Sequence, residues 1–307
     1  MPWDHFALAL GIAFAAALAY YSALRLPPYI QTAVWLGCSI IVAASPCVIP
    51  LNATPLRFLA ALFAITVLVK LHDLHRENRL ALRLSVWSYL TYLPNGFWLV
   101  LRRKPRRRPK MDDMRKLAVR APAALFSATA CWFLFQIDWS IVSFALEHTL
   151  KVTAVVAAVI FTNNAAAAAY RLLGGVGQDF MRNPFAANTP AEFWRRWNVP
   201  AQLYLAEYAF KPSGGLRKPV WATLLTFAVS GVCHEYVFGM ASGRFQGWQF
   251  LFFVLQGCAA AATLRIKPEG PSALLWLAGT WAFNLISSFL FFLSVDQVLP
   301  FYFLRAS

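Results

Sequence analysis

The stretch PVWATLLTFAVSGVCHEYVFGMAS, residues 219–242, is apolar for almost its whole length. About 20 consecutive apolar residues suffice for a helix to cross a bilayer, so this stretch predicts a membrane-spanning helix. His234 and Glu235 interrupt it ~22 Å along the helix from Pro219. Ionisable side chains at such a depth are costly and usually mark a function. We therefore treat both residues as candidate site residues.

The neighbours of His234 add to this expectation. Ser230 and Gly231 lie four and three residues before it and share its helix face. Their small side chains leave room beside the imidazole for a neighbouring helix or a substrate channel. Glu235 points about 100° away around the helix, so we expect it to pair with an arginine or a hydroxyl. The alternative for His234 is a neutral imidazole that donates one hydrogen bond to another span.

The rest of the chain shares this apolar character. Of its 307 residues, 59% are hydrophobic and 13% are charged, against about 45–50% and about 25% in soluble domains. This composition predicts an all-α polytopic membrane protein, with a single membrane domain over residues 1–307 and no separate soluble domain. Eight segments are candidate spans: 6–24, 29–49, 56–71, 118–137, 152–173, 219–241, 247–264 and 272–294.

Basic residues set the expected orientation in the membrane. Residues 102–120 hold ten Lys and Arg and two Asp, in a chain of net charge +15. We interpret them as a cytoplasmic loop that faces anionic lipid headgroups, in preference to a nucleic-acid site. The same rule places the N-terminus outside, and residues 174–218 inside, of what we expect to be a bacterial inner membrane. Segment 84–101 must then be a re-entrant hairpin or an interfacial helix covered by protein.

A second polar segment, NPFAANTPAEFWRRWN, covers residues 183–198. Thr189, Pro190 and Glu192 form a helix-start signal, with an N-cap, a proline at the first helical position and a capping-box acid. We expect one helix from there, kinked at Pro200. Its aromatic side chains recur at intervals of four, seven and four residues and predict a single stripe: Phe193, Trp197, Tyr204 and Tyr208.

The polar side chains of this expected helix lie beside the stripe. Trp194 and Asn198 are four residues apart and share a neighbouring face, whereas Arg195 and Arg196 point elsewhere. Aromatic and basic faces on one helix are typical of the membrane–water interface. The plain alternative is that the helix only anchors the chain at that interface.

Two other groups of residues raise the question of a metal. His72, Asp73 and His75 lie within KLHDLHREN (70–78) but lack the ligand number and helical spacing of a zinc site. We interpret them as the polar end of a span. The five cysteines have no paired spacing and indicate neither disulfides nor a metal site. We expect no metal and no cofactor.

His234 and Asn198 together suggest acid–base chemistry. A neutral imidazole is the usual general base near pH 7, and an asparagine amide can orient an acceptor or stabilise an oxyanion. The turn FKPSGGLRKP (210–219) allows the two elements to meet. No serine or cysteine is clearly paired with a base, so direct transfer is simpler than a covalent intermediate.

The segments 183–198 and 229–239 together resemble the membrane-bound O-acyltransferase family, and most of all its wax-synthase-like branch. The residues that carry the resemblance are Pro184, Phe185, Thr189, Phe193, Trp194, Arg195, Arg196, Trp197, Asn198, Ser230, Gly231, His234 and Glu235. They cover about 60 residues of the chain; the upstream half resembles the family only in hydropathy.

The resemblance implies a helical membrane fold with a central tunnel, acyl-CoA as co-substrate from the cytoplasmic side and a lipophilic hydroxyl acceptor from another opening. His234 would be the catalytic base and Asn198 its partner, with the catalytic motif region at 183–239. We expect substrate contacts from seven residues: Trp194, Arg195, Arg196, Trp197, Ser230, Gly231 and Glu235. CoA phosphates would meet basic residues among Arg195, Arg196, Lys211, Arg217 and Lys218.

Three functions remain open from the sequence. The first is transfer of a fatty acyl group to a long-chain alcohol. The second is the same chemistry on a sterol, a diacylglycerol, a secondary metabolite or a glycan. The third, which we favour least, is a transporter or a non-catalytic scaffold, since no pair of matching broken spans marks the two halves. The sequence is silent on oligomeric state.

Overall fold

The computed structural model describes residues 2–303, and these residues form helices without any strand. Eight long helices correspond to the eight expected spans: α1 (Pro2–Ala23), α2 (Pro28–Ala44), α3 (Thr54–Arg76), α6 (Lys110–Leu134), α7 (Phe144–Leu172), α10 (Pro219–Ser242), α11 (Trp248–Ala262) and α12 (Pro271–Asp296). Seven are long and apolar enough to cross a membrane, and α11, with 15 residues, is shorter. The prediction of an all-α polytopic membrane protein is confirmed.

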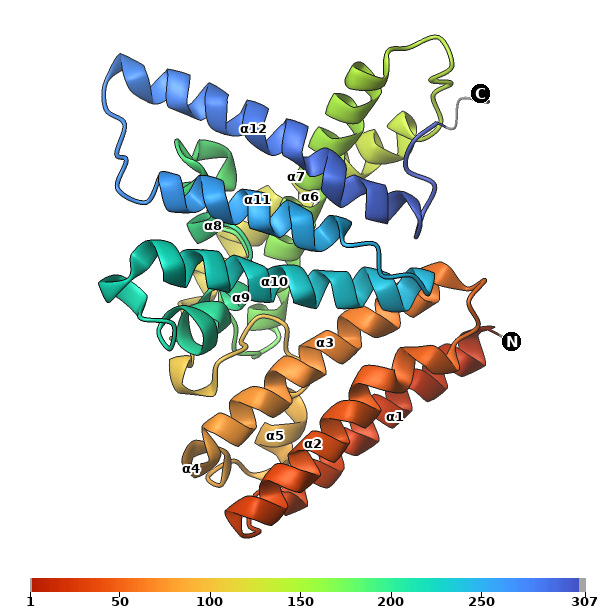
Figure 1. Cartoon of the computed structure of the whole chain (residues 1–307), viewed down its shortest axis with the longest axis vertical. Coiled ribbons are helices and arrows are strands. Elements are labelled where there is room, and N and C mark those ends of the chain that lie inside the picture. Colours follow the sequence, from red (N-terminus) through yellow and green to blue (C-terminus); the bar gives the residue numbers. More distant parts are fainter. Residues whose placement is uncertain (1, 304–307) are drawn as a thin grey trace.

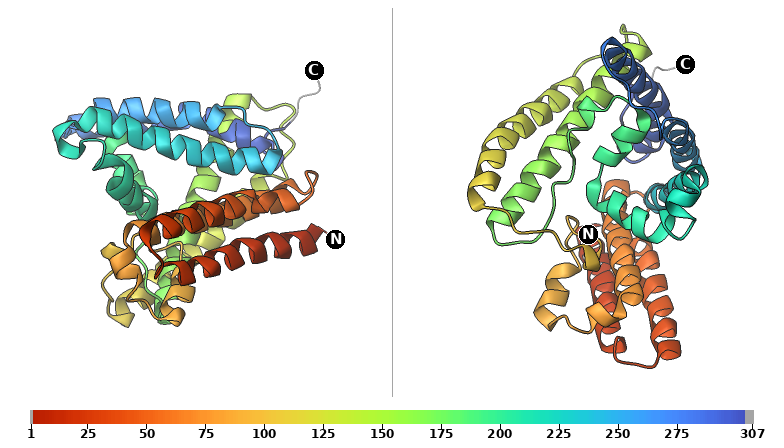
Figure 2. Two further views of the ribbon diagram at one scale, coloured as in Figure 1. Left: turned by 60° about the horizontal axis from the view of Figure 1, so that its bottom comes forward. Right: turned by 90° about the vertical axis from the view of Figure 1, so that its left-hand side faces the viewer.

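The long helices form three groups (Figure 1). Helices α1, α2 and α3 pack together, α6 and α7 form a hairpin, and α10, α11 and α12 lie side by side in a layer. Helix α3 joins the first group to the layer through α10, and α7 contacts α12. The short helices α8 (Pro190–Arg196) and α9 (Val199–Leu205) lie between the hairpin and the layer (Figure 2).

Polar side chains fasten these groups to one another. On α3, the buried Arg57 donates from Nε to the carbonyl of Met240 at 2.8 Å and from Nη1 to that of Ile49 at 2.6 Å. These bonds satisfy two helix-end carbonyls and fix α3 against the end of α10. Small residues let α1 approach its neighbours, because Ala13, Ala17 and Tyr20 are fully buried in the largest apolar cluster.

Two expected loop regions are partly helical. Helix α6 begins at Lys110, so the second half of the basic 102–120 segment is helix, and the expectation of a loop is wrong there. Lys and Arg are good helix formers, and Asp112 and Asp113 in the first turn suit the positive end of the helix dipole.

Helix α7 likewise begins earlier than the expected span, at Phe144, with Ser143 as its N-cap. The charged residues that suggested a position partly outside the bilayer are buried and paired. Lys151 donates to Glu147 and to the carbonyl of Phe301, both at 2.7 Å.

Segment 84–101 folds as a short helix and an irregular return. Helix α5 (Val86–Tyr92) follows the four-residue helix α4 (Asn78–Ala81), and the 3₁₀ turn η2 (Leu101–Arg103) ends the return. The hydroxyl of the buried Tyr92 donates to Asp73 at 2.6 Å, and Asn95 donates to the carbonyl of Val176 at 2.8 Å. The broken backbone is thus covered by protein, as both expected arrangements required.

The expected single helix after Thr189 is wrong. Thr189 does cap α8 by accepting from Glu192 N, but the helix ends at Arg196 and a second helix, α9, begins at Val199. Pro200 cannot donate a backbone hydrogen bond and crowds the preceding turn, so the helix breaks before it. Asn198 adopts the left-handed conformation, with φ 38°, which asparagine tolerates better than most residues.

The break divides the expected aromatic stripe into two pairs. Phe193 stacks on Trp197 with ring centroids 5.4 Å apart. Tyr204 contacts Tyr208 at 5.0 Å, on α9 and the π-helical turn η4 (Ala206–Phe210) that continues it.

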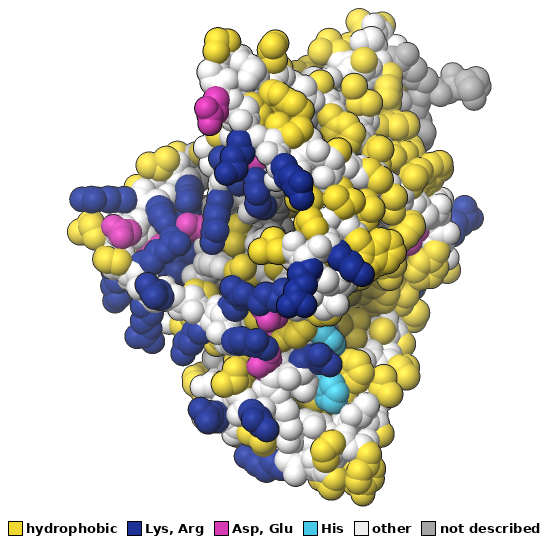
Figure 3. Space-filling model, turned by 60° about the vertical axis from the view of Figure 1, so that its left-hand side comes forward, with side chains coloured by type: hydrophobic (Ala, Val, Ile, Leu, Met, Phe, Trp, Pro, Cys, Tyr) yellow, Lys and Arg dark blue, Asp and Glu magenta, His cyan; other side chains and the backbone are white. Residues whose placement is uncertain are grey.

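Lys and Arg side chains gather over one face of the molecule (Figure 3). It is the face where α3 ends and α6, α10 and α12 begin, which is the left side of Figure 1. The N-terminus lies at the opposite side. This distribution agrees with the expected orientation, in which the basic segments share one side of the membrane.

Candidate active site

His234 lies near the middle of α10 and faces the two other helices of its layer. Its ring centroid is 4.2 Å from that of Phe253 on α11 and 6.3 Å from that of Phe291 on α12. Nδ1 is 2.8 Å from the carbonyl oxygen of Ser230. A carbonyl only accepts, so Nδ1 carries the proton and Nε2 keeps its lone pair. No other hydrogen bond to this ring occurs within residues 2–303, and the ring is only half-buried, so Nε2 is available as a base.

The residues expected to flank His234 have structural reasons to be there. Ser230 contributes its backbone carbonyl to the imidazole. A side chain on Gly231 would come within 3.1 Å of the Phe250 backbone and within 3.2 Å of Phe253. The space beside His234 at this position is therefore filled by a neighbouring helix, α11.

Glu235 does not pair with an arginine or a hydroxyl, which corrects that expectation. Its carboxylate accepts backbone N–H groups of Gln246 and Gly247 on one oxygen, and of Gln249 and Phe250 on the other, at 2.6–3.4 Å. The first turn of α11 begins here, and a carboxylate satisfies its unpaired N–H groups and its dipole. Glu235 thus positions α11 against α10.

Asn198 occupies the sharp break between α8 and α9. Its side-chain oxygen accepts from Ala201 N at 3.3 Å, and its backbone N–H contacts the sulfur of Met181 at 3.2 Å. The cap uses the oxygen, so the Nδ2 donors face away from α9 and have no hydrogen-bond partner among the described residues. Asn198 is half-buried.

Asn198 and His234 are linked through shared neighbours and not by a hydrogen bond in the described chain. Trp194, on the helix that ends at Asn198, packs against Phe253, which also contacts His234. On the other side, burial and then the nearby Cys233 thiol raise the pKa of Tyr204 above its usual value. Helices α8 and α9 therefore flank α10 at the level of His234.

A polar ladder that sequence reasoning missed runs from Trp194 across the layer. Trp194 Nε1 donates to Gln256 Oε1 at 2.9 Å, and Gln256 Nε2 donates to Ser287 Oγ at 2.8 Å. Asn284 lies one turn before Ser287, and both its amide oxygen and its amide nitrogen are buried without a partner. Phe291, which contacts His234, is two turns further along the same face of α12.

The signal for this ladder was present in the sequence as amides inside apolar runs. Gln256 and Asn284 lie within the candidate spans 247–264 and 272–294. Neither is charged, so a search for intramembrane ionisable residues passed over them. A pairless amide in hydrocarbon carries a similar message, because it needs a partner that the protein does not supply.

Two hollows flank this region. One, of about 430 Å³, opens on the basic face and is lined by His72, Arg76, Glu77, Arg102, Glu207, Tyr208, Lys211 and Pro212. The other, of about 420 Å³, is mostly apolar and is lined by Pro190, Ala259, Ala262, Thr263, Leu275, Trp276, Gly279, Thr280 and Phe283. Neither is lined by His234 or Asn198, so the central tunnel stays a prediction.

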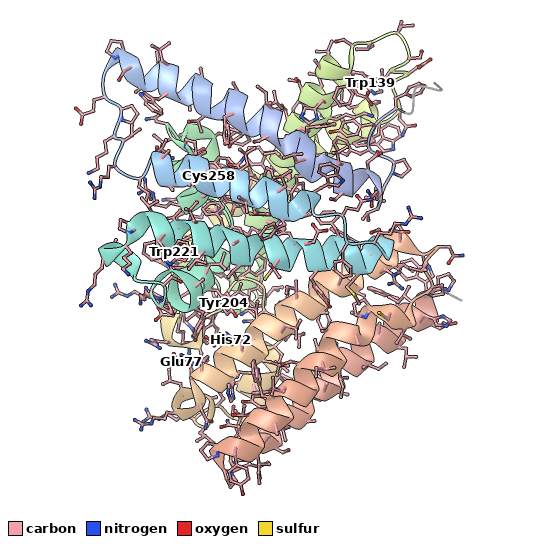
Figure 4. The ribbon with its side chains drawn as sticks, viewed as in Figure 1. His72, Glu77, Trp139, Tyr204, Trp221 and Cys258 are labelled. Carbon is pink, nitrogen blue, oxygen red and sulfur yellow. The ribbon has the colours of Figure 1, made fainter. Side chains whose placement is uncertain are left out.

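The KLHDLHREN segment forms the floor of the polar hollow. Tyr204 hydrogen-bonds His72 Nδ1 at 2.8 Å, and Tyr208 donates to Asp73 at 2.7 Å. Figure 4 shows His72, Glu77 and Tyr204 close together where α3 ends beneath the start of α10. His75 instead bonds Tyr20. These side chains thus serve different tyrosines.

The basic residues expected to hold phosphates are distributed differently. Arg196 pairs with Glu192 and donates to the carbonyl of Asn183, whereas Arg195 is exposed. Lys211 lines the polar hollow and pairs with Glu207. Arg217 and Lys218 are exposed on the turn before α10. Arg76 and Arg102 of the hollow were not anticipated.

Comparison with known families decides what this arrangement belongs to. A model described as MBOAT, membrane-bound O-acyltransferase family, matches residues 114–295, more than half of the chain. The chain belongs to the membrane-bound O-acyltransferase family. The match includes α8, α9 and the whole α10–α12 layer, and it leaves helices α1 to α5 outside. The resemblance seen in segments 183–198 and 229–239 is thereby confirmed.

Several curated members of this O-acyltransferase family are similar to parts of the chain. A probable long-chain-alcohol O-fatty-acyltransferase 8 of Arabidopsis thaliana is 28% identical over 140 residues, 41% of this chain and 42% of that protein. Diacylglycerol O-acyltransferase 1-1 of Oryza sativa is 32% identical over 94 residues, 30% of this chain and 17% of that protein. A probable sterol O-acyltransferase 1 of Schizosaccharomyces pombe is 37% identical over 67 residues, 21% of this chain and 12% of that protein. The chain thus covers less than half the length of each.

Proposed function

We propose that this protein transfers a fatty acyl group from acyl-CoA to the hydroxyl of a lipophilic alcohol, with His234 as the general base. The observation that carries the proposal is the Nδ1 bond to the Ser230 carbonyl, which leaves Nε2 free to accept a proton. Family membership favours this chemistry over a transporter or a scaffold.

The proposed reaction needs one base and one donor. Nε2 of His234 takes the hydroxyl proton as the alcohol oxygen attacks the thioester carbonyl. The oxyanion of the tetrahedral intermediate accepts from the unpartnered Nδ2 of Asn198. As the carbon–sulfur bond breaks, the imidazolium returns the proton to the departing thiolate, so that an ester and CoA result.

The polar ladder gives the acceptor a place to bind. Asn284 offers one amide acceptor and two donors without protein partners. An alcohol hydroxyl, or a thioester carbonyl, supplies what this amide lacks. Gln256 is already used by Trp194 and Ser287, and so it holds the ladder in place. We assign Asn284 to substrate positioning.

We assign the two hollows to the two ends of the substrates. The polar hollow has three basic lining residues, Arg76, Arg102 and Lys211, and suits the phosphates of CoA. The apolar hollow borders the start of α8, where Thr263 accepts from Ala191 N, and suits an alkyl chain. The basic face is then cytoplasmic in a bacterial inner membrane, and acyl-CoA enters from it.

A long-chain alcohol is our first choice of acceptor. The relatives named for long-chain alcohols match over a larger share of their own length, 42% for one, than the diacylglycerol and sterol relatives, at 17% and 12%. The second choice is a sterol or a diacylglycerol, because relatives of those names also match.

Purified protein in neutral lipid, given labelled acyl-CoA and one alcohol at a time, tests the proposal. We expect free CoA and a labelled ester to form together, fastest with a long-chain alcohol. Hydrolysis of the thioester without any ester, with every acceptor tried, would contradict it.

A further inference from the structure

A single carboxylate at the base of the α6–α7 hairpin is surrounded by four cations. Asp179 pairs with Arg108 at 2.8 Å, with Lys116 and Arg120 at 3.0 Å, and with Arg171 at 3.1 Å. Arg171 also pairs with Asp113 at 2.6 Å. We call these residues the Asp179 cluster: Arg108, Asp113, Lys116, Arg120, Arg171 and Asp179. Four cations and two carboxylates leave an excess of two positive charges.

The excess charge is not removed by protonation of Asp179. Burial alone would raise the pKa of this carboxyl, but the hydrogen bonds from Arg108, Arg120 and Lys116 lower it well below its usual value. Asp179 therefore stays ionised, and the cluster keeps its surplus of cations at neutral pH.

The cluster is also short of hydrogen-bond acceptors. Arg171 is only 8% exposed, and its Nη1 is buried without any acceptor. At the rim, the side chains of Arg108 and Lys116 keep 37% and 30% of their surface exposed. Each makes one bond to Asp179 and has further N–H groups to offer. The cluster thus presents unused donors at its surface.

An exposed apolar stripe begins beside this rim. Beyond Lys116, helix α6 shows Val119, Phe126 and Phe133 at intervals of seven residues, on one helix face. They are 73%, 78% and 57% exposed. Helix α6 packs mainly on α7, and Asp113 and Ser127 are its only buried residues among those described. An anion-binding rim above an apolar stripe has the shape of a site for an anionic amphiphile.

We propose that the Asp179 cluster binds the phosphodiester group of an anionic phospholipid, whose acyl chains lie along Val119, Phe126 and Phe133. The phosphate oxygens accept from the outward N–H groups of Arg108, Lys116 and Arg120, since basic residues beside spanning helices bind such headgroups. Two positive charges in excess favour a lipid with net negative charge over zwitterionic phosphatidylcholine. The site is separate from His234 and goes beyond the acyl-transfer proposal.

A pair of charge-matched double variants tests the site. Arg108→Gln/Lys116→Gln removes two rim cations, and Arg106→Gln/Arg107→Gln removes two exposed cations of the same segment that make no contact with the cluster. The measurement is the affinity for phosphatidylglycerol by native mass spectrometry of the full chain. We expect the first variant to bind about thirtyfold more weakly, from about 1 kcal/mol per basic residue, and the second to bind as the wild type does.

Two further arms guard the interpretation. Phe126→Gln alters only the exposed stripe and should also weaken lipid binding, so the test does not depend on the folding of the rim variant. Thermal unfolding in phosphatidylcholine nanodiscs should rise when phosphatidylglycerol is included and should not respond to inorganic phosphate. An equal loss in both double variants would show diffuse charge attraction, and a response to inorganic phosphate would show a site for a soluble anion; either result overturns the proposal.

Discussion

At the scale of single residues, the chemistry depends on which atoms the protein uses and which it leaves free. The Ser230 carbonyl uses Nδ1 of His234, and the α9 cap uses the oxygen of Asn198. What remains is one lone pair and one pair of N–H donors, which are the two groups that ester formation from a thioester requires. Local backbone geometry therefore defines the proposed roles.

Asn284→Leu separates function from stability. The change removes an amide whose two polar atoms have no partner, so stability should stay equal or rise by about 1–2 kcal/mol. Ester formation should fall by about 10- to 100-fold, because a positioning group is lost.

Thermal unfolding and initial rates, measured side by side, check this. Asn163→Leu, in span α7, is the control, since that amide already donates to the carbonyl of Val159. Unchanged ester formation in Asn284→Leu would remove Asn284 from the proposed site.

Sequence reasoning found the residues of the motif but not the residues that surround it. His234 and Asn198 were visible because a histidine inside a span and an asparagine in a recognisable motif are both unusual. The partners of Trp194 and Tyr204 come from α11 and α3, 62 and 132 residues away along the chain. Such contacts depend on how helices are placed, which local patterns do not encode.

At the scale of elements, the close approach of α10 and α11 holds Phe253 against His234. Gly231 faces the Phe250 backbone, and Gly257 faces Phe227, where an added Cβ would lie 2.7 Å from the Phe227 Cβ. Glu235 then fastens the start of α11 through four backbone N–H groups. One helix thus carries the base and also positions the helix that packs on it.

Gly231→Ala should destabilise the protein by about 1–3 kcal/mol, because the added methyl group crowds the α11 backbone. Gly37→Ala on α2 is the matched control, since an added Cβ there meets nothing within 4 Å. Denaturation monitored by thermal shift in neutral lipid distinguishes the two variants. Equal unfolding temperatures for both would mean that α10 and α11 are not in close contact at Gly231.

Glu235→Gln should also lower the unfolding temperature, through loss of the charged cap on α11. A capping interaction contributes about 1–2 kcal/mol. Glu269→Gln, at an exposed loop carboxylate, serves as the control and should have little effect. If Glu235→Gln is as stable as the wild type, the cap does not hold α11.

The elements themselves were largely predictable. All eight expected spans correspond to helices, because long apolar runs are the strongest signal that a chain carries. The errors concern polar segments. The basic run at 110–120 is helical, and the motif helix breaks at Asn198, before Pro200. In both cases a tertiary partner or a backbone constraint outweighed the hydropathy pattern.

At the scale of the whole molecule, the site is assembled from both halves of the chain. The family match covers residues 114–295, but His72 and Arg76 of the polar hollow come from α3, outside that match. The same hollow is lined by Glu207, which pairs with Arg102 and Arg103 and so fastens the 101–103 segment to η4. Helix α3 therefore contributes to the basic face where we place entry of acyl-CoA.

Asp179 holds the α6–α7 hairpin to the segment that leads into α8. Asp179→Asn should cost about 3 kcal/mol at pH 7, because it leaves buried cations without a counter-charge. The native pKa of Asp179 is depressed, so its stabilisation is complete above the unfolded-state value of about 4 and is lost as the pH falls further. The wild type and the variant should differ most above about pH 5 and converge in acid.

Unfolding temperatures of both proteins between pH 7 and pH 3 check this dependence. Asp112→Asn, an exposed change in the first turn of α6, is the control and should track the wild type. A gap between Asp179→Asn and the wild type that stays constant down to pH 3 would contradict the depressed pKa.

The most direct test of the account is the rate of CoA release by His234→Ala, with acyl-CoA and a long-chain alcohol, compared with the wild type at equal amounts of folded protein. Removal of a general base should lower the rate by about 10²- to 10⁴-fold while the unfolding temperature changes little. Release of CoA and ester by folded His234→Ala at the wild-type rate would show that this imidazole does not carry the reaction.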